Sequence, residues 1–258
     1  TAKERQHSGK LKVTTTVNMV SDLVREVGGE HVEVSELMGP GVDPHLFKAS
    51  AGDVDKLMNA DVVFYVGLLL EGKIQDTLEK VESAHAVAEG IGHERLLKPS
   101  EFEGHFDPHI WFDVMLWVET VDVVVEGLGK ADPEHLSDYK MNGEATKAKM
   151  RALHQWALTK VEELPENKRI LITSHDAYNY FARAYDFQVV GLQGISTVSE
   201  ASLADVAKMV DFIKDKGVKA VFVESSVSPA AIKRISQDSG AKIGGELFSD
   251  AMGERGRM

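Results

Sequence analysis

Cysteine is absent from the 258 residues of this chain. Its absence excludes a disulfide framework, a thiolate metal site and a cysteine nucleophile. Long apolar runs are missing too, since none approaches the roughly 18 residues that suggest a membrane-spanning helix. The chain also has no glycine-rich phosphate loop and no Gly-x-Ser-x-Gly elbow, which argues against nucleotide-binding proteins and serine hydrolases.

Positive charge is scarce. The chain has 29 Lys and Arg against 41 Asp and Glu, a formal net charge of −12. Nucleic acid is therefore not an expected partner, because a basic patch is its usual electrostatic footprint. The acidity favours the approach of cations, although it is equally explained by solubility alone. The polar N-terminus, Thr1 to Lys10, has no apolar signal region; it fits either a cytosolic start or a tether left after an export signal was removed.

The rest of the chain alternates strand-like and helix-like runs, which predicts an α/β fold with mostly parallel sheets. The length allows two domains, each with its own core. The expected strands are 11–17, 31–37, 61–66, 84–88, 169–173, 187–192, 220–223 and 241–243. The expected helices are 19–27, 50–59, 71–81, 113–129, 177–185, 202–216 and 228–238, and 90–106 is expected to be loop. Ser50, with Asp53 in the first turn, and Ser228, followed by Pro229, are expected to cap the helices that they begin.

One long helix is expected between the two α/β halves. Asp132-Pro133-Glu134 is typical of a helix start, with Asp as N-cap and Pro at the first helical position. Good helix formers dominate the stretch up to Pro165. A coiled coil is the alternative, but the apolar spacing is irregular. We therefore expect an N-terminal lobe at 1–131, a rigid linking helix at 132–164 and a C-terminal lobe at 165–258.

Three histidines stand out. His45 and His109 each end an Asp-Pro-His tripeptide, and His175 follows the apolar strand-like run that ends in Thr173-Ser174. A lone histidine in a loop is most often a surface residue, and Asp43 and Asp107 are equally typical of residues that start turns. However, the repeated tripeptide, stiffened by proline, favours a pre-organised ligand. The other seven histidines have no such setting, including His105.

These histidines are expected where strands give way to helices, which is where open α/β sheets bind ligands. Asp250 also follows an expected strand and is the best candidate for a fourth ligand. Three imidazoles and one carboxylate suit a borderline divalent ion. Zn²⁺ takes such a set as a tetrahedron, and Mn²⁺ is the alternative if it is the available ion. Calcium and magnesium want mostly oxygen ligands and are not expected.

The chain resembles the TroA-like family, the zinc- and manganese-binding receptors of ABC importers. The matching stretches, in chain order, are 37–45, 60–61, 67–68, 106–113, 173–177, 191–196, 223–226 and 245–250. The resemblance implies two α/β lobes joined by one long helix and one metal ion between the lobes. It implies His45, His109, His175 and Asp250 as the metal ligands.

Some features bear on the choice of metal and on the end of the chain. Manganese-specific relatives often have glutamate where this chain has His175, so the position looks zinc-capable. Zinc receptors often carry a long His-rich loop between the first two ligands, which is missing here. Val66 and Leu69 replace residues that are polar in some relatives. The resemblance also implies a terminal helix after the aspartate loop, whereas the sequence stops eight residues after Asp250.

The resemblance predicts a receptor, periplasmic or lipid-anchored at the outer face of a bacterial membrane. It would capture Zn²⁺ or Mn²⁺ and deliver it to the membrane subunit of an ABC permease, as a monomer and without enzymatic activity. One rival is a metallohydrolase with Asp176 or Glu224 as general base. Another is a receptor for a metal chelate or haem. Glu224 is expected either to accept a hydrogen bond from a ligand imidazole or to serve as a helix cap or domain contact.

Overall fold

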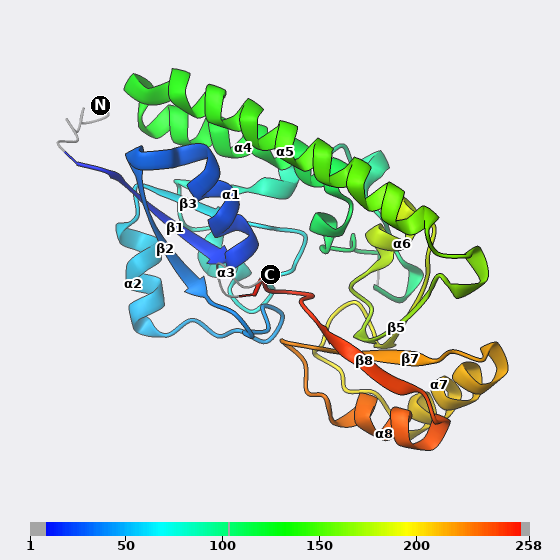
Figure 1. Ribbon diagram of the computed structural model, residues 1–258. Coiled ribbons are helices and arrows are strands. Elements are labelled where there is room, and N and C mark those ends of the chain that lie inside the picture. Colours follow the sequence, from blue (N-terminus) through cyan, green and yellow to red (C-terminus); the bar gives the residue numbers. More distant parts are fainter. Residues whose placement is uncertain (1–8, 103, 254–258) are drawn as a thin grey trace.

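The computed structural model describes residues 9–102 and 104–253. It has two lobes, each a parallel α/β unit, and one long helix that runs from the first lobe to the second (Figure 1). The predicted fold class is thereby confirmed.

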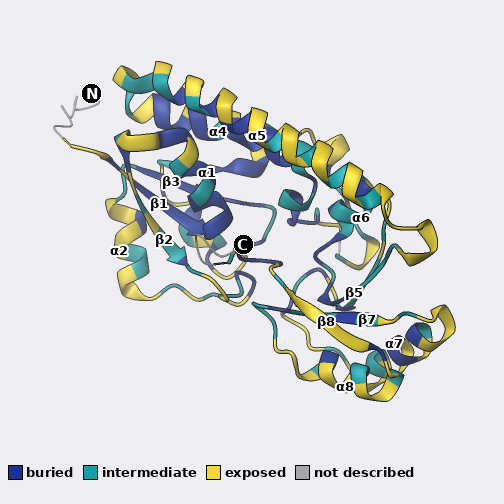
Figure 2. Ribbon diagram, in the orientation of Figure 1, coloured by how far each residue is buried: buried dark blue, intermediate teal, exposed yellow. Residues whose placement is uncertain are grey.

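The N-terminal lobe is built on one parallel sheet in the order β2-β1-β3-β4. Its strands are β1 (Leu11–Val17), β2 (Val32–Met38), β3 (Val62–Tyr65) and β4 (Ala84–Ala86). Its helices are α1 (Asn18–Gly28), α2 (Ala51–Asn59), α3 (Gln75–Leu78) and α4 (Val114–Ala131). Every residue of β3 is buried, as expected for a central strand covered on both faces (Figure 2). Ser50 is the N-cap residue of α2, as predicted, and forms a capping box with Asp53.

The C-terminal lobe has two parallel strand pairs, β5 with β6 and β7 with β8. The strands are β5 (Ile170–His175), β6 (Gln188–Gln193), β7 (Ala220–Glu224) and β8 (Lys242–Leu247). The helices are α6 (Asn179–Tyr185), α7 (Leu203–Lys216) and α8 (Ala230–Ser239). Strand β5 lies next to β7, so the two pairs form one layer with His175 and Glu224 at neighbouring carboxyl ends. This lobe has its own apolar core, separate from that of the first lobe.

Helix α5 (Leu136–Glu162) is the long linking element. Its 27 residues span about 40 Å at 1.5 Å per residue. It packs against α1 and α4 of the first lobe and against α6 of the second, with its outer face exposed (Figure 2). Because one continuous helix contacts both lobes, it resists bending between them.

Two local predictions are wrong. The helix expected at 71–81 is reduced to α3, because the Glu71 side chain turns into the core and holds the turn after β3. Its Oε1 accepts hydrogen bonds from Thr16 Oγ1 at 2.6 Å and Val66 N at 2.8 Å, and its Oε2 accepts one from Gly67 N at 3.1 Å. A carboxylate that satisfies backbone donors in a buried turn overrides local helix propensity.

Asp132 is the N-cap residue and Pro133 the first helical residue, as predicted, but of a 3₁₀ turn, Pro133–His135, that precedes α5. The Asp132 side chain makes no capping hydrogen bond. Its Oδ2 instead accepts hydrogen bonds from Tyr139 OH at 2.6 Å and His135 Nδ1 at 2.7 Å. Ser228 does not cap α8, whose N-cap residue is Pro229.

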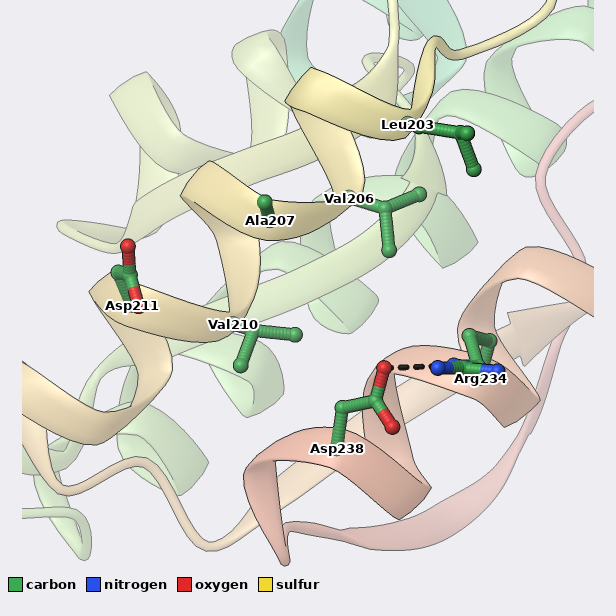
Figure 3. A pocket seen from close by; sticks show the side chains of 7 residues that line it. All are labelled: Leu203, Val206, Ala207, Val210, Asp211, Arg234 and Asp238. Carbon is green, nitrogen blue, oxygen red and sulfur yellow. Dashed lines mark hydrogen bonds and ion pairs between the residues drawn. The ribbon is translucent and has the colours of Figure 1, made fainter.

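A groove of about 390 Å³ lies between α7 and α8 (Figure 3). Leu203, Val206, Ala207, Val210 and Asp211 reach it from α7, and Arg234 and Asp238 from α8. Arg234 Nε and Asp238 Oδ2 form an ion pair at 2.6 Å across one turn of α8. The groove lies apart from the strand ends where the polar site is found.

Candidate metal centre

Four buried side chains from four separate loops or strand ends meet at the seam between the lobes. His45 follows β2, His109 precedes α4, His175 ends β5 and Asp250 follows β8. Each of the four residues is at most 3% exposed. One potential ligand atom from each lies within 4.8 Å of all the others, and no other such group of three or more occurs in the described part of the chain. The structure thus brings together every predicted site residue.

The pairwise distances are those of a tight cluster. His45 Nε2 and His109 Nε2 are 3.4 Å apart. The Asp250 carboxylate lies 3.4 Å from His109 Nε2, 3.3 Å from His175 Nε2 and 3.9 Å from His45 Nε2. A tetrahedral ion with bonds of about 2.0–2.1 Å needs edges of about 3.3–3.4 Å between ligand atoms. Three of these four separations match such an edge, whereas the 3.9 Å between His45 and Asp250 is longer, so a small shift would bring these two side chains to the spacing of a small ion.

The two Asp-Pro-His segments form the same turn but hold their histidines differently. Asp43 Oδ1 accepts from His45 N at 2.9 Å, and Asp107 Oδ1 accepts from His109 N at 3.0 Å, so both aspartates start turns. Asp107 Oδ1 also lies 2.7 Å from the Nδ1 of the His109 ring. This contact leaves Nε2 of His109 free to face the cluster. Asp43 Oδ2 instead accepts from Thr197 Oγ1 at 2.6 Å, across the seam.

Glu224 orients the third histidine. Its Oε2 lies 2.5 Å from His175 Nδ1, and its Oε1 accepts from the backbone N–H of Ser174 at 2.6 Å and of His175 at 3.0 Å. The hydrogen bond to the ring, one of the two expectations for Glu224, is present. A carboxylate on Nδ1 fixes the tautomer whose Nε2 carries the lone pair, as metal-binding histidines require. Strand β7 thereby sets the direction of a side chain on β5.

Burial and neighbouring charges shift the pKa of every member of the cluster. Burial lowers the pKa of His45 to about 3. Burial also opposes the charging of His109, but the carboxylates of Asp107 and Asp250 outweigh it and raise the pKa to about 9. In the same way Asp250 and Glu224 overcome burial and hold the pKa of His175 well above its usual range. Asp250 is buried, yet the neighbouring His175 and His109 hold its pKa well below its usual range.

Several buried polar atoms of the cluster lack hydrogen-bond partners. Within the described residues, His175 Nε2 and both carboxylate oxygens of Asp250 are buried and have no hydrogen-bond partner. Leaving such atoms unpaired costs about 1–3 kcal/mol each. A cation that displaces the proton from His175 would supply the missing partner, and the donor set of three imidazole nitrogens and a carboxylate suits a borderline divalent metal.

Contacts between the lobes hold this geometry, and sequence reasoning missed them. Trp111 Nε1 donates to Ser249 O at 2.9 Å, directly beside Asp250. Asn18 and Met252 exchange two hydrogen bonds of 2.7 and 2.9 Å, which fasten the segment after Asp250 to α1. Partners so far apart in sequence leave no local signal, although the 106–113 stretch singled out by the family resemblance does contain Trp111.

The residues set aside or proposed for other roles also have clear positions. His105 stacks edge-on against Phe102 and is not part of the cluster. Asp176 is adjacent to His175, and burial raises its pKa, but it contributes no atom to the cluster. Glu224 is occupied by His175 and the backbone, so it is not free to act as a general base.

Two α/β lobes, a long helix across both and a closed cluster of metal-binding side chains at their seam define a solute-binding receptor for a metal ion. Comparisons with known proteins give the same class. Residues 13–257 match the family described as ZnuA, zinc-uptake complex component A, periplasmic. The chain belongs to this family.

The relatives are close. The manganese-binding lipoprotein MntA of Bacillus subtilis is 46% identical, over 96% of this chain and 83% of its own length. The zinc-binding protein TroA of Treponema pallidum is 42% identical, over 99% and 85%. A solved structure of periplasmic TroA from the same organism superimposes with a TM-score of 0.93 at 41% identity, covering 96% of this chain and 92% of that one. The metal ABC transporter substrate-binding lipoprotein SloC of Streptococcus mutans is 30% identical, over 96% and 84%.

These comparisons confirm the predicted TroA-like resemblance and its functional class. The chain is a substrate-binding protein of a metal ABC importer, and the family consists of receptors, not enzymes. The words periplasmic and lipoprotein in these names agree with the expected location, which is periplasmic or lipid-anchored at the outer face of a bacterial membrane. In the described residues no helix is both long and apolar enough to span a membrane.

Proposed function

We propose that His45, His109, His175 and Asp250 together bind one divalent transition-metal ion, Zn²⁺ or Mn²⁺, which the protein delivers to the membrane subunit of an ABC permease. The observation that carries the proposal is the convergence of four buried ligand atoms within 4.8 Å. Because His175 Nε2 and the Asp250 oxygens have no hydrogen-bond partner within the described residues and face one another at 3.3 Å, an ion between them would complete the site.

The ion is a cargo and not a catalyst. Four protein ligands fill a tetrahedral coordination sphere, so no position is left for an activated water. The cluster is also too tightly closed for a chelate or haem, because the ligand atoms whose separations are given lie 3.3–3.9 Å apart. Both rival functions predict a wider, open site.

The donor set favours Zn²⁺ over Mn²⁺ in direct competition, since affinity for nitrogen and oxygen ligands rises along the divalent series. MntA and TroA, the relatives with the highest identities given above, are named for manganese and zinc respectively. We therefore keep both ions as candidate cargoes. Which of the two ions is carried in the cell depends on which is available at the outer face of the bacterial membrane.

The proposal divides the chain into an N-terminal lobe at 1–131, a linking helix at 132–164 and a C-terminal lobe at 165–258. Two apolar cores support this division, although Tyr180 of α6 belongs to the first core. The site is completed within one chain, so a monomer suffices to hold the ion. Each lobe supplies two of the four ligands, which means that separating the lobes would release it.

Competitive chelator titration of the demetallated protein tests the proposal. The unmodified protein should take up one Zn²⁺ or one Mn²⁺ per chain. His109→Ala should weaken binding by well over tenfold, since even losing a partner outside the metal's own ligands costs about 10–100-fold. His105→Ala, in the same loop but outside the cluster, is the matched control and should bind normally. Equal affinities for the two variants would exclude this site.

A further inference from the structure

The site is sealed, so the ion needs a way in. All four proposed ligands are at most 3% exposed. A second cavity, of about 380 Å³, lies directly against the site on the seam between the lobes. Leu46, the residue after His45, and Ser174, the residue before His175, both line it. The cavity is therefore lined by a chain neighbour of one proposed ligand from each lobe.

The lining of this cavity suits a cation. Among the described residues that form it are the carboxylates of Asp43 and Glu200, and none is Lys, Arg or His. Hydroxyl and amide side chains supply further oxygen atoms, including Thr197 and Gln193. Oxygen donors and a negative field attract a hydrated divalent ion without binding it as tightly as imidazoles do. The volume has room for the six waters of such an ion, at about 30 Å³ each.

An orphaned polar atom marks the inner wall. Ser174 is 3% exposed and lines the cavity, and its Oγ has no hydrogen-bond partner within the described residues. A buried hydroxyl without a protein partner costs about 1–3 kcal/mol, so the cavity wall carries an unsatisfied polar group directly beside His175. It sits one residue from His175, where a passing ion would exchange water for imidazole.

A single hydrogen bond joins the two sides of this cavity. Asp43 Oδ2 of the first lobe accepts from Thr197 Oγ1 of the second at 2.6 Å, and both residues line the cavity. Asp43 is also the residue whose Oδ1 holds the His45 turn. A contact that spans the seam and includes the turn of a proposed ligand is well placed to close the route once the ion has passed.

We propose that the cavity lined by Asp43, Ser174, Thr197 and Glu200 is the antechamber through which a hydrated divalent cation reaches and leaves the buried site. The inference rests on the proposed function. It adds the route, the oxygen donors that receive the ion before the imidazoles do, and a closing contact between Asp43 and Thr197.

A bulky side chain that blocks the antechamber tests the route without changing a proposed metal ligand. Ala230 lines the antechamber at the exposed start of α8, and Ala207 lies in the α7–α8 groove of the same lobe (Figure 3). Ala230→Trp should lower both the association and the dissociation rates of Zn²⁺, by at least about tenfold, and leave the Kd unchanged. Ala207→Trp, the matched control, should leave both rates unchanged. Stopped-flow binding and chelator-driven release give the two rates.

A second variant keeps the test valid if Ala230→Trp does not fold. The chain has no cysteine, so Ala230→Cys can be labelled at one position after folding with a bulky methanethiosulfonate reagent. Labelling should slow uptake and release together, and reduction should restore both rates. Unchanged rates at position 230, or a change in Kd without a matched change in both rates, would overturn the antechamber. Failure of the unmodified protein to bind zinc or manganese would instead refute the proposed function.

Discussion

Replacing Glu224 with Gln tests the link between a buried carboxylate and the proposed metal ligand His175. The Glu224 carboxylate accepts three hydrogen bonds, two from backbone N–H groups and one from His175 Nδ1. An amide of the same shape has only one accepting oxygen. If that oxygen keeps the backbone pair, the amide NH₂ faces Nδ1 and stabilises the tautomer protonated at Nε2, which cannot bind a metal.

The alternative orientation of the amide is no better. With its oxygen towards the ring, the NH₂ group meets two backbone donors, and each donor left unpaired costs about 1–3 kcal/mol. Glu224 is 2% exposed, so solvent gives little relief. We expect Glu224→Gln to weaken zinc binding about 10–100-fold, or about 1.4–2.8 kcal/mol. The metal-free variant should also have a lower free energy of unfolding.

Chelator competition measures the affinity, and urea unfolding measures the stability. Glu246→Gln removes the same charge from an exposed position on β8 and should leave zinc affinity unchanged. NMR of the imidazole nitrogens would show directly whether His175 changes tautomer. A Glu224→Gln protein that binds zinc as tightly as the unmodified protein would refute the reasoning.

Four further tests address other parts of the site. Gly191→Ala places a Cβ 2.5 Å from the backbone nitrogen of Asp176, so the His175 loop must shift. We expect a loss of about 1–3 kcal/mol in the free energy of unfolding and weaker zinc binding. Gly194→Ala, where nothing lies within 4 Å of the added Cβ, is the control and should change neither. His109 and His175 have raised pKa values, so metal uptake should release more than one proton, seen by calorimetry in buffers of different ionisation enthalpy. Protonated His109 stabilises the metal-free protein fully below pH 6.5, and this stabilisation is lost as the pH rises through its pKa of about 9. The zinc-induced rise in Tm should therefore grow between these two pH values. A rise in Tm that stays constant across them would contradict the raised pKa of His109. His175→Glu should reduce zinc affinity more than manganese affinity, because it replaces an imidazole with a harder carboxylate, and an unaltered ratio in competitive titration would contradict this account of selectivity.

Much of the site was visible in the sequence because its signals are local. The Asp-Pro-His repeat encodes a turn that each aspartate closes on the backbone of its histidine. His175 was identified by its place after an apolar strand, and it is the last residue of β5. Alternation of strands and helices predicted the parallel architecture, and the Ser50 cap was predicted from the acidic residue three positions later.

Two departures from the predicted local structure share one physical cause. Glu71 and Asp132 both bind groups that local patterns do not reveal, and each therefore leaves the role that its local sequence indicates. The contact between Asp43 and Thr197 joins residues 154 positions apart, and a hydroxyl in a loop gives no sign of its partner. Long-range side-chain pairing, rather than backbone propensity, decided these features.

The most direct test of the central claim is anomalous diffraction at the zinc absorption edge from crystals of the zinc-loaded protein. The account predicts one peak per chain, about 2.0–2.2 Å from Nε2 of His45, His109 and His175 and from the carboxylate of Asp250. A zinc peak held by other residues, or a zinc ion in this seam bound mainly by water, would contradict it.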